Sequence, residues 1–387
     1  MKKGWKVTKM IEVFELQMGK TPSRDNPAYW GGTEPWVSIG DMGASKFILS
    51  TKENITNQAV IDSGIKLVPK GTVIMSFKLS VGKVAIAAKP LYTNEAIMSF
   101  KPRGGFSLSS DYIYYYLKGY KWDGVNRAAM GLTLNKASIS QGQFAFPSLS
   151  EQERIVAELD LLQGIIDKQK AQLKELDTLA QSIFYDMFGD PVMNDRHWDT
   201  ARLGSCCTSV SYGTSAPSSA EGEYVYLRMN NITYDGQLDL RDVKYISVSE
   251  TDFEKYAVKE GDVLFNRTNS ADLVGKTTWM HGHKPMIIAG YIIRVRLNER
   301  LLPGFVSAFM NTKEMKVVLK AMGKGAVNQS NINSKELQSI LTPIPPLPLQ
   351  QAFATKIEAI ERQKASINAS IAETQKLFDY TMDKYFG

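Results

Sequence analysis

Two long stretches of the chain carry a hydrophobic pattern that is typical of amphipathic helices. In the first, between Leu149 and Met187, apolar residues recur at steps that are mostly three, four or seven, with charged residues between them. These apolar residues are Ile155, Leu159, Leu162, Ile166, Leu173, Leu176, Leu179, Ile183 and Met187. Such spacing places them on one face of a helix, and Gly189 and Pro191 end it. The pattern predicts one long helix over residues 149–188.

The second stretch, from Leu347 to Tyr385, repeats this pattern. Its apolar positions, which begin with steps of four, three, seven and four, are Phe353, Ile357, Ile360, Ile367, Ile371 and Leu377. Lys364 interrupts this heptad-like series, as polar residues often do where they fix a helix register. Because a narrow apolar face on a long helix needs a partner, we expect the two helices to pair within the chain. The alternative is that each helix packs on its own domain.

The remaining residues, 1–148 and 197–345, show the shorter patterns of mixed α/β domains. Apolar runs at 73–77 and 84–88 lie near turn glycines and predict strands. Asp111 is placed to cap a short helix that contains Tyr112, Tyr114, Tyr115 and Tyr116. The favoured interpretation of these tyrosines is packing against a core, and the alternative is stacking on nucleic-acid bases.

These two regions are copies of one another. Trp5 and Trp198 open them at an offset of 198 − 5 = 193. The further matches, in order, are 36–42 with 226–232, 70–74 with 260–264, 81–83 with 274–276, 135–139 with 328–332 and 147–149 with 345–347. Identity is low, but the order is kept throughout. Two diverged readers on one scaffold suit a target that has two parts.

The length and amino-acid composition of the chain agree with two globular domains. The chain has 387 residues, of which 43% are hydrophobic and 22% charged, and its formal net charge is +6. A basic balance fits a nucleic-acid partner without establishing one. The two cysteines, Cys206 and Cys207, are adjacent and are expected to be reduced thiols. Without an apolar signal segment or a run of about 18 apolar residues, we expect a cytoplasmic protein.

No residue pattern predicts catalysis. Asp25-Asn26-Pro27-Ala28-Tyr29 is similar to the Asn-Pro-Pro-Tyr loop of amino-methyltransferases, but Ala28 replaces a proline and no cofactor-binding Gly-rich turn accompanies it. Gly275-Lys276-Thr277 ends like a P-loop, but Ser270 stands where that motif needs glycine. His281 and His283 have no nearby Cys or carboxylate cluster. We therefore predict no catalytic residue, no metal site and no cofactor bound by the chain itself.

Polar loops at repeated positions are the candidate DNA contacts. The loop 19–24 offers backbone amides, hydroxyls and two cations for phosphates. Arg228 and the asparagines that follow it are suited to guanine and adenine edges, whereas their counterparts at 38–41 differ in hydrogen-bonding character. The alternative for each cluster is a solvated turn. The predicted contacts are Lys20, Thr21, Ser23, Arg24, Ser38, Lys78, Asn135, Arg228, Asn230, Asn231, Asn266, Arg267, Asn269, Asn328 and Gln329.

With these motifs in order, the chain resembles the specificity (S) subunit of type I restriction–modification systems over essentially its whole length. The motifs are 19–23, 29–32 and 36–41 in the first copy, 261–264 and 266–267 in the second, the Pro-rich segments 146–152 and 344–350, and Met187-Phe188-Gly189-Asp190-Pro191. One departure is Leu349-Gln350-Gln351, where the family usually has a Glu-Gln pair.

The resemblance implies an α/β fold with two repeated target-recognition domains, separated by two long antiparallel helices that form an intramolecular coiled coil with pseudo-two-fold symmetry. The expected parts are a first recognition domain at 1–148, a spacer helix at 149–188, a linker at 189–196, a second recognition domain at 197–345 and a second spacer helix at 346–387. Each domain would read one half of a split, asymmetric site in double-stranded DNA, with the helices as a ruler for the unread spacer.

The resemblance also implies partners. Two methyltransferase (M) subunits would dock on the chain and modify adenines with S-adenosylmethionine, and two restriction (R) subunits would add ATP- and Mg-dependent translocation and cleavage. The S subunit itself would be inert, with no membrane contact. Two alternatives stay open. The chain would then be the recognition part of a fused restriction–methylation enzyme, or a coiled-coil adaptor with two protein-binding heads.

Overall fold

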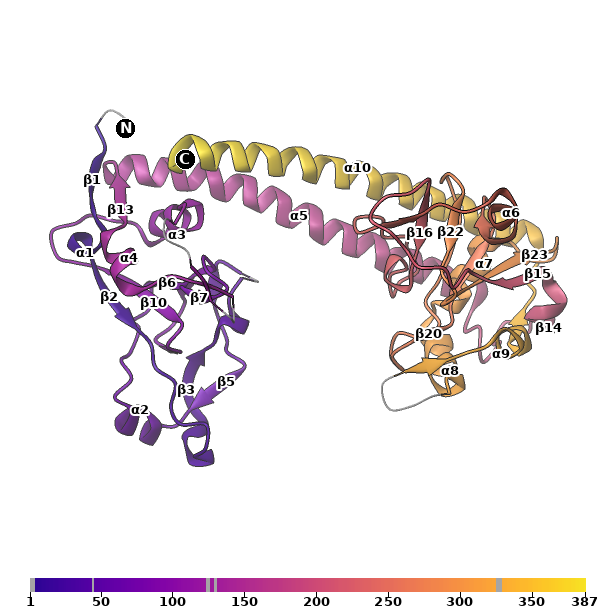
Figure 1. The fold of residues 1–387 in the computed structure, drawn as a ribbon, viewed down its shortest axis with the longest axis horizontal. Coiled ribbons are helices and arrows are strands. Elements are labelled where there is room, and N and C mark those ends of the chain that lie inside the picture. The colour runs from indigo at the N-terminus through magenta and orange to yellow at the C-terminus, as the bar shows by residue number, and fades with distance from the viewer. Residues whose placement is uncertain (1–3, 44, 123–125, 129–130, 325–328) are drawn as a thin grey trace. The chain divides into compact units, whose positions relative to one another are not determined.

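The computed structural model describes residues 4–43, 45–122, 126–128, 131–324 and 329–387, and its chain divides into two units (Figure 1). Unit 1 consists of residues 1–170 and 369–387, and unit 2 of residues 171–368. Each unit holds one copy of the α/β repeat together with a part of each long helix. Within the described residues no helix has the length and apolarity needed to cross a membrane.

Unit 1 is built on a five-stranded sheet with smaller strand groups around it. The sheet order is β2 (Phe14–Met18), β10 (Ile97–Pro102), β6 (Val73–Ser76), β8 (Val84–Ala87) and β4 (Phe47–Ile48). A second group is β5 (Glu53–Ile55), β3 (Trp30–Val37) and β9 (Tyr92–Thr93). The others are β1 (Lys6–Lys9) with β13 (Gln143–Phe146), and β11 (Asn126–Ala128), β12 (Gly131–Thr133) and β7 (Lys78–Leu79). Its short helices are α1 (Met10–Val13), α2 (Asn57–Ser63), α3 (Ser110–Gly119) and α4 (Lys136–Gln141).

The tyrosines of α3 form the aromatic core of unit 1. Tyr112 is fully buried, and its ring lies 6.2 Å from Phe144 and 5.6 Å from Phe386. Its hydroxyl donates to the Ala145 carbonyl at 2.8 Å. Tyr115 is also buried and donates to Asp160 on the first long helix at 2.5 Å. The packing interpretation is confirmed, and base stacking by these rings is wrong.

Unit 2 repeats the plan. Its main sheet has the order β15 (Cys207–Tyr212), β23 (Ile292–Leu297), β19 (Val263–Asn266) and β21 (Thr277–Trp279). The other groups are β17 (Lys244–Ile246), β16 (Tyr224–Leu227), β22 (Met286–Ile288) and β18 (Ala257–Val258); β14 (Thr200–Arg202) with β25 (Leu341–Pro343); and β20 (Thr268–Asn269) with β24 (Ser330–Asn331). Its helices are α6 (Glu250–Tyr256), α7 (Pro303–Met310), α8 (Lys313–Met322) and α9 (Ser334–Ser339). In both units one strand pair is parallel at the same place, β3 with β9 and β16 with β22.

One detail of the predicted repeat is wrong. Asn135 caps α4, and its side chain accepts a hydrogen bond from the Ser138 N–H at 2.7 Å. The corresponding cap of α9 is Asn333, which accepts from the Lys335 and Glu336 N–H groups. Asn135 therefore corresponds to Asn333 rather than to Asn328, and Asn328 lies outside the described residues. The cap fixes where the helix begins, whereas the sequence match rested on a short polar motif.

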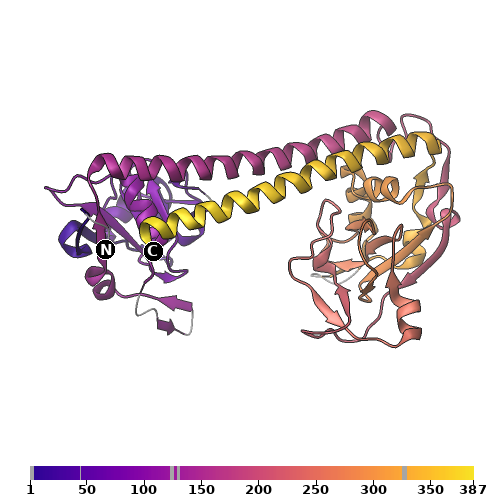
Figure 2. The ribbon, with the colours of Figure 1, turned by 90° about the horizontal axis from the view of Figure 1, so that it is seen from above.

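The long helices α5 (Leu149–Phe188) and α10 (Leu347–Phe386) run side by side (Figures 1 and 2). In unit 1, Gln169 donates to Ser370 at 2.7 Å. In unit 2, the Lys364 ammonium lies 2.8 Å from Asp177, and Phe184 packs 5.7 Å from Phe353. Residues late in α5 meet residues early in α10, so the pairing is antiparallel. The predicted intramolecular pair is confirmed.

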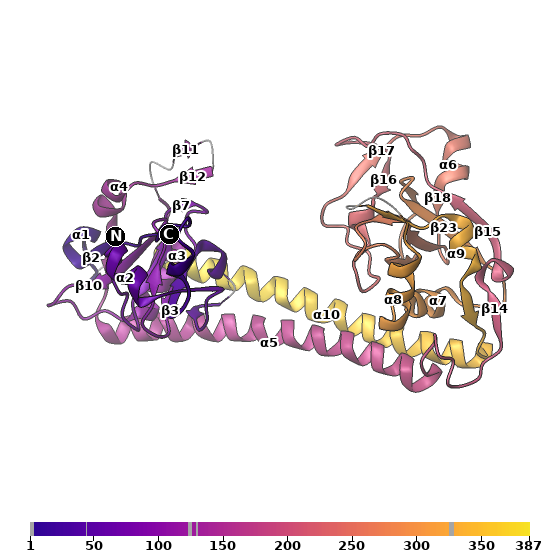
Figure 3. The ribbon, with the colours of Figure 1, turned by 90° about the horizontal axis from the view of Figure 1, so that it is seen from below.

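Each long helix also packs on the α/β core of the unit it enters. In unit 2, α7 lies between the strands and the helix pair (Figure 3), and Phe305 of α7 stacks 5.8 Å from Phe184. A buried glutamine anchors the start of each long helix. Gln350 donates to the carbonyls of Arg300 and Pro345 and accepts from the Leu302 N–H. Gln152 makes the matching three bonds in unit 1, so the departure at Leu349 leaves this anchor intact.

Candidate nucleic-acid interface

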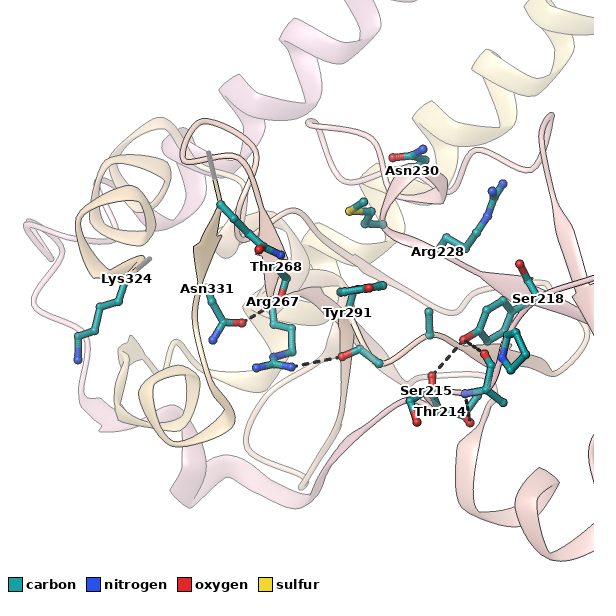
Figure 4. A pocket seen from close by; sticks show the side chains of 17 residues that line it. Thr214, Ser215, Ser218, Arg228, Asn230, Arg267, Thr268, Tyr291, Lys324 and Asn331 are labelled. Atoms are coloured by element: carbon teal, nitrogen blue, oxygen red, sulfur yellow. Dashed lines mark hydrogen bonds between the residues drawn. The ribbon is translucent and has the colours of Figure 1, made fainter. Parts of the chain in front are cut away.

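A cavity of about 780 Å³ opens on unit 2 where several of the loops with predicted DNA contacts meet (Figure 4). Its lining consists of Thr214, Ser215, Ala216, Pro217, Ser218, Tyr226, Arg228, Met229, Asn230, Arg267, Thr268, Ala289, Gly290, Tyr291, Lys324, Gln329 and Asn331. Four of the predicted contacts, Arg228, Asn230, Arg267 and Gln329, are therefore brought together from segments that lie far apart in the sequence. The site is rich in hydrogen-bond donors and hydroxyls, which suits the edges of bases and phosphate oxygens.

The floor of this site is the loop that begins at Gly213. The Thr214 N–H donates to the Ile288 carbonyl at 2.9 Å, which joins the loop to the carboxyl end of β22. A Cβ at Gly213 would collide with the backbone of Ile288 and Ala289, so only glycine fits there. Tyr226 fixes the loop further, because its hydroxyl lies 3.0 Å from both the Thr214 and Ala216 carbonyls.

Two arginines form opposite parts of the wall (Figure 4). Arg228 donates through Nη2 to the Asp242 carbonyl at 2.8 Å and to its carboxylate at 3.2 Å. Arg267 makes one long bond, from Nη1 to the Gly290 carbonyl at 3.5 Å, and its guanidinium lies 4.8 Å above the Tyr212 ring. The Nε atoms of both arginines are buried and have no hydrogen-bond partner among the described residues. The bonds above use only Nη2 of Arg228 and only Nη1 of Arg267, so the other terminal nitrogen of each guanidinium keeps donors that a ligand can use.

Three of the predicted contacts are structural side chains beneath the site. Asn231 is buried, and its amide donates to the carbonyls of Asp239 and Asp242. Asn266 is also buried and donates to the carbonyls of Thr268 and Tyr291, while Asn269 donates to the Asn266 side chain. These amides hold the loops in place and do not line the cavity. Asn230, one residue from Asn231, is exposed.

The sequence did not single out three groups at this site. Tyr291 is 50% exposed just before β23, Ser218 lies on the loop after Gly213, and Lys324 lies two residues beyond α8. Lys324 is paired with Glu336 at 2.9 Å, and this hydrogen bond raises the pKa of the lysine. The repeat gives a signal for Ser218 alone, because it lies on the loop 213–218, which matches the predicted contact loop 19–24 of the first copy.

In the corresponding loop of unit 1, residues 19–24, polar side chains are hydrogen-bonded to other groups of the same unit. Lys20 donates to the Ser63 carbonyl at 2.6 Å, and Thr21 is hydrogen-bonded to Glu95. Arg24 lies 3.7 Å above the Trp30 ring, and its guanidinium forms two bonds to Glu53, which raise the pKa of Arg24. The side chain of Arg24 is nevertheless half exposed.

The other predicted contacts of unit 1 have mixed surroundings. Ser23 is exposed, and its carbonyl accepts from the Trp30 indole N–H at 3.1 Å. Ser38 donates to Asp41 at 2.7 Å, Lys78 is partly exposed, and Asn135 is the helix cap described above. The structure places Lys20, Thr21 and Ser23 on the loop equivalent to the cavity floor of unit 2. The two cations of this loop are held by protein groups, Lys20 by the Ser63 carbonyl and Arg24 by the Glu53 carboxylate.

In the described part of the chain, no three His, Cys, Asp or Glu side chains are placed to hold a metal ion. His281 is hydrogen-bonded through Nδ1 to the Glu260 carboxylate at 2.9 Å, and its ring stacks on Trp279 with the ring centroids 4.7 Å apart. Cys206 and Cys207 are free thiols, and burial raises the pKa of Cys207 to about 12. A thiol with so high a pKa is a poor nucleophile.

Comparisons with known proteins agree with the repeated architecture. The family model described as "Type I restriction modification DNA specificity domain" matches residues 2–178 and again residues 196–375. The chain is 22% identical to the type I restriction enzyme EcoKI specificity subunit of Escherichia coli K12, over 99% of this chain and 88% of that protein. It is 30% identical over 241 residues to the MjaIX specificity subunit of Methanocaldococcus jannaschii, and this match spans 54% of that relative's length.

Two solved structures share the fold. One, described as the structural basis of complex assembly and conformational transition of the type I R-M system, aligns with a TM-score of 0.60 and 18% identity over 100% of this chain and 98% of that one. The other, an S subunit of a type I restriction–modification system from M. genitalium, aligns with a TM-score of 0.55 and 13% identity over 99% and 96% of the two chains. At these identities the likeness concerns the fold alone.

Proposed function

The chain belongs to the family of type I restriction modification DNA specificity domains, and from this premise we propose that it reads a split DNA site with two different half-site readers. As a specificity subunit, it recognises DNA and is not itself the catalyst. The proposal assigns one half-site to each unit. It further assigns the cavity on unit 2 to base recognition in the second half-site.

The observation that carries this proposal is the convergence of Arg228, Asn230 and Arg267 on one cavity, at positions that the repeat fills differently in unit 1. Ser38 takes the place of Arg228 in the turn after β3, and the buried Phe77 takes the place of Arg267 after β6. The two places are equivalent, because Phe77 donates its N–H to Ala96 as Arg267 does to Tyr291, each at 2.9 Å. Arginine pairs bidentately with guanine, whereas serine and phenylalanine do not. The two readers therefore suit different sequences, as an asymmetric site requires.

We also propose that the long helices set the length of the unread spacer. α5 and α10 each have 40 residues, which corresponds to about 60 Å of helix at 1.5 Å per residue. Each is one uninterrupted helix that contributes residues to both units. The Lys364–Asp177 ion pair and the Gln169–Ser370 hydrogen bond support a fixed register between them.

The partners and the location in this proposal follow from the family. We propose that two methyltransferase subunits and two restriction subunits assemble on the chain, that the former bind S-adenosylmethionine, and that the latter use ATP and Mg. The chain itself binds none of these cofactors. It acts on double-stranded DNA, without a membrane, in the cytoplasm.

The test uses the full chain, purified alone and with its methyltransferase subunits, on a library of duplexes with random sequence. We expect sequencing of the bound duplexes to give a motif of two short halves separated by a fixed gap. Arg228→Ala should weaken base preference in one half only. Arg202→Ala is the matched control, because Arg202 is an exposed arginine of unit 2 outside the cavity.

Two outcomes would contradict the proposal. Absence of any salt-dependent DNA binding would favour the protein adaptor, and methylation by the isolated chain would favour a fused enzyme. An Arg228→Ala variant that alters both halves of the motif would contradict the assignment of one half-site to each unit.

A further inference from the structure

The same short turn stands beside the reading groups in both units. In unit 1 it is the 3₁₀ turn Ile39–Asp41, which follows Ser38, and in unit 2 it is Met229–Asn231, which follows Arg228. In each, the side chain of the last residue accepts a hydrogen bond from the N–H of the residue that precedes the turn, at 2.8 Å and 3.0 Å. Each turn is therefore stabilised by a hydrogen bond of its own.

A lysine from a distant hairpin approaches this turn in both units. The Lys276 ammonium donates to the carbonyl of Met229 at 2.7 Å. The Lys83 ammonium donates to the carbonyl of Ile39, the equivalent residue, at 3.4 Å. Lys83 and Lys276 are the lysines of the repeated Val-Gly-Lys motif, and the two hydrogen bonds join the same positions of the repeat. An accidental surface contact would not be expected twice.

The backbone around each Gly-Lys pair explains why the lysine reaches the turn. Gly82 and Gly275 have φ angles of 88° and 82°, in the left-handed region that favours glycine. Their N–H groups donate at 2.9 Å to the carbonyls of Ser76 and Asn266, the last residues of β6 and β19. The carbonyl of each following lysine accepts from the N–H of that same residue. This frame directs the lysine back along the sheet, toward the turn.

The surroundings of Lys276 show that the contact matters. Lys276 is only 6% exposed, and burial lowers its pKa. A lysine is seldom buried so far unless its ammonium is paired, and the acceptor here is the Met229 carbonyl. Because Met229 lies between Arg228 and Asn230, which face the cavity, release of its carbonyl would displace both of these groups.

We propose that Lys83 and Lys276 are positioning residues, each of which holds the reading turn of its own unit in the geometry that recognises bases. This inference rests on the proposed function, because it assigns the turns to DNA reading. The lysines themselves touch no DNA. They act on specificity through Ser38 and Gly40 in unit 1 and through Arg228 and Asn230 in unit 2.

The test compares the full chain with Lys276→Met and Lys83→Met, assembled with the methyltransferase subunits, on the random duplex library. Methionine keeps most of the aliphatic stem but removes the donor. Since one hydrogen bond to a charged group is lost, we expect base preference to fall about tenfold or more in the half-site of the altered unit alone. Lys83→Arg, which keeps a cationic donor at a partly exposed position, should restore most of the preference.

Each outcome decides the question. Unchanged preference in Lys83→Met and in a folded Lys276→Met would overturn the inference. So would equal weakening on all sequences, which marks a role in stability alone, and so would a Lys83→Arg variant as impaired as Lys83→Met. Because Lys83 is less buried than Lys276, its variants decide the inference if Lys276→Met fails to fold. If the unaltered chain selects no motif, the proposed function fails instead, and the two failures are distinguishable.

Discussion

Replacing Arg267 with alanine should cost the protein specificity and very little stability. The side chain of Arg267 makes one long hydrogen bond, at 3.5 Å, and one contact with the Tyr212 ring, at 4.8 Å. Together these contribute about 1 kcal/mol to folding. The backbone of Arg267, which bonds to Tyr291 and Ile332, is unaffected by the substitution. The free energy of unfolding should therefore fall by about 1 kcal/mol.

The expected loss of discrimination is larger. A bidentate arginine–guanine contact contributes about 1–3 kcal/mol of preference over another base, which corresponds to about 5- to 150-fold in relative affinity. The one described hydrogen bond of this side chain uses Nη1, which leaves Nη2 free to make that contact, whereas Nε is buried. The substitution should flatten the preference at one or two base pairs of a single half-site.

The assay is competition binding of the full chain to the selected duplex and to duplexes altered at one base pair, at two or more salt concentrations. Arg267→Lys is the informative control, since it keeps the charge but loses the planar fork. Equal weakening on every duplex, with the salt slope reduced by about one, would mark a phosphate contact and refute the assignment to a base.

Three further predictions follow from other parts of the structure. A matched insertion of four residues after Leu173 in α5 and after Ile367 in α10 adds about 6 Å of helix and overshoots one turn by about 40°. Mapping of methylated adenines should show the same half-sites with a gap one or two base pairs longer. An unchanged gap would mean that the helices do not set the spacer length. Gln350→Ala leaves two carbonyls and one N–H of the buried anchor without their partner, so hydrogen exchange should show unit 2 destabilised by about 3 kcal/mol or more, and exchange unchanged in unit 2 would contradict this. Burial lowers the pKa of Lys316 to about 8, so between pH 8 and its ordinary pKa of about 10.5 the unfolded chain binds a proton that the folded chain lacks. The free energy of unfolding should therefore rise across that window by up to about 3 kcal/mol. Urea unfolding of Lys316→Met should show a smaller rise.

The large features of the fold are predictable because they rest on many residues. The apolar series of the long helices and the stop at Gly189 give α5 its observed bounds, and α10 its own to within one residue. The repeat is equally robust, since several matches in one order predict two related domains. The order β2-β10-β6-β8 of unit 1 recurs as β15-β23-β19-β21 in unit 2, and β4 is added in unit 1. The match of Asn135 with Asn328 fails because a motif of five residues cannot fix a helix cap.

The candidate site is only partly predictable, because neighbouring residues of one type have different roles. Asn230 faces the cavity while Asn231 is buried under it, and only the turn geometry separates them. From the sequence, Lys276 is only part of an incomplete P-loop motif, and its contact with Met229 is visible only in the structure. Tyr291 gives no signal at all, since an exposed ring just before a buried strand depends on what the rest of the fold leaves uncovered.

The central claim, that each unit reads its own half of a split site, is tested most directly by exchanging one reader. Residues 1–148 would be replaced by those of a relative with a different specificity, and methylated adenines would be mapped in cells that carry the chimera and the partner subunits. The account predicts a motif in which one half is new while the other half and the gap stay as they were. A change in both halves, or in neither, would contradict it.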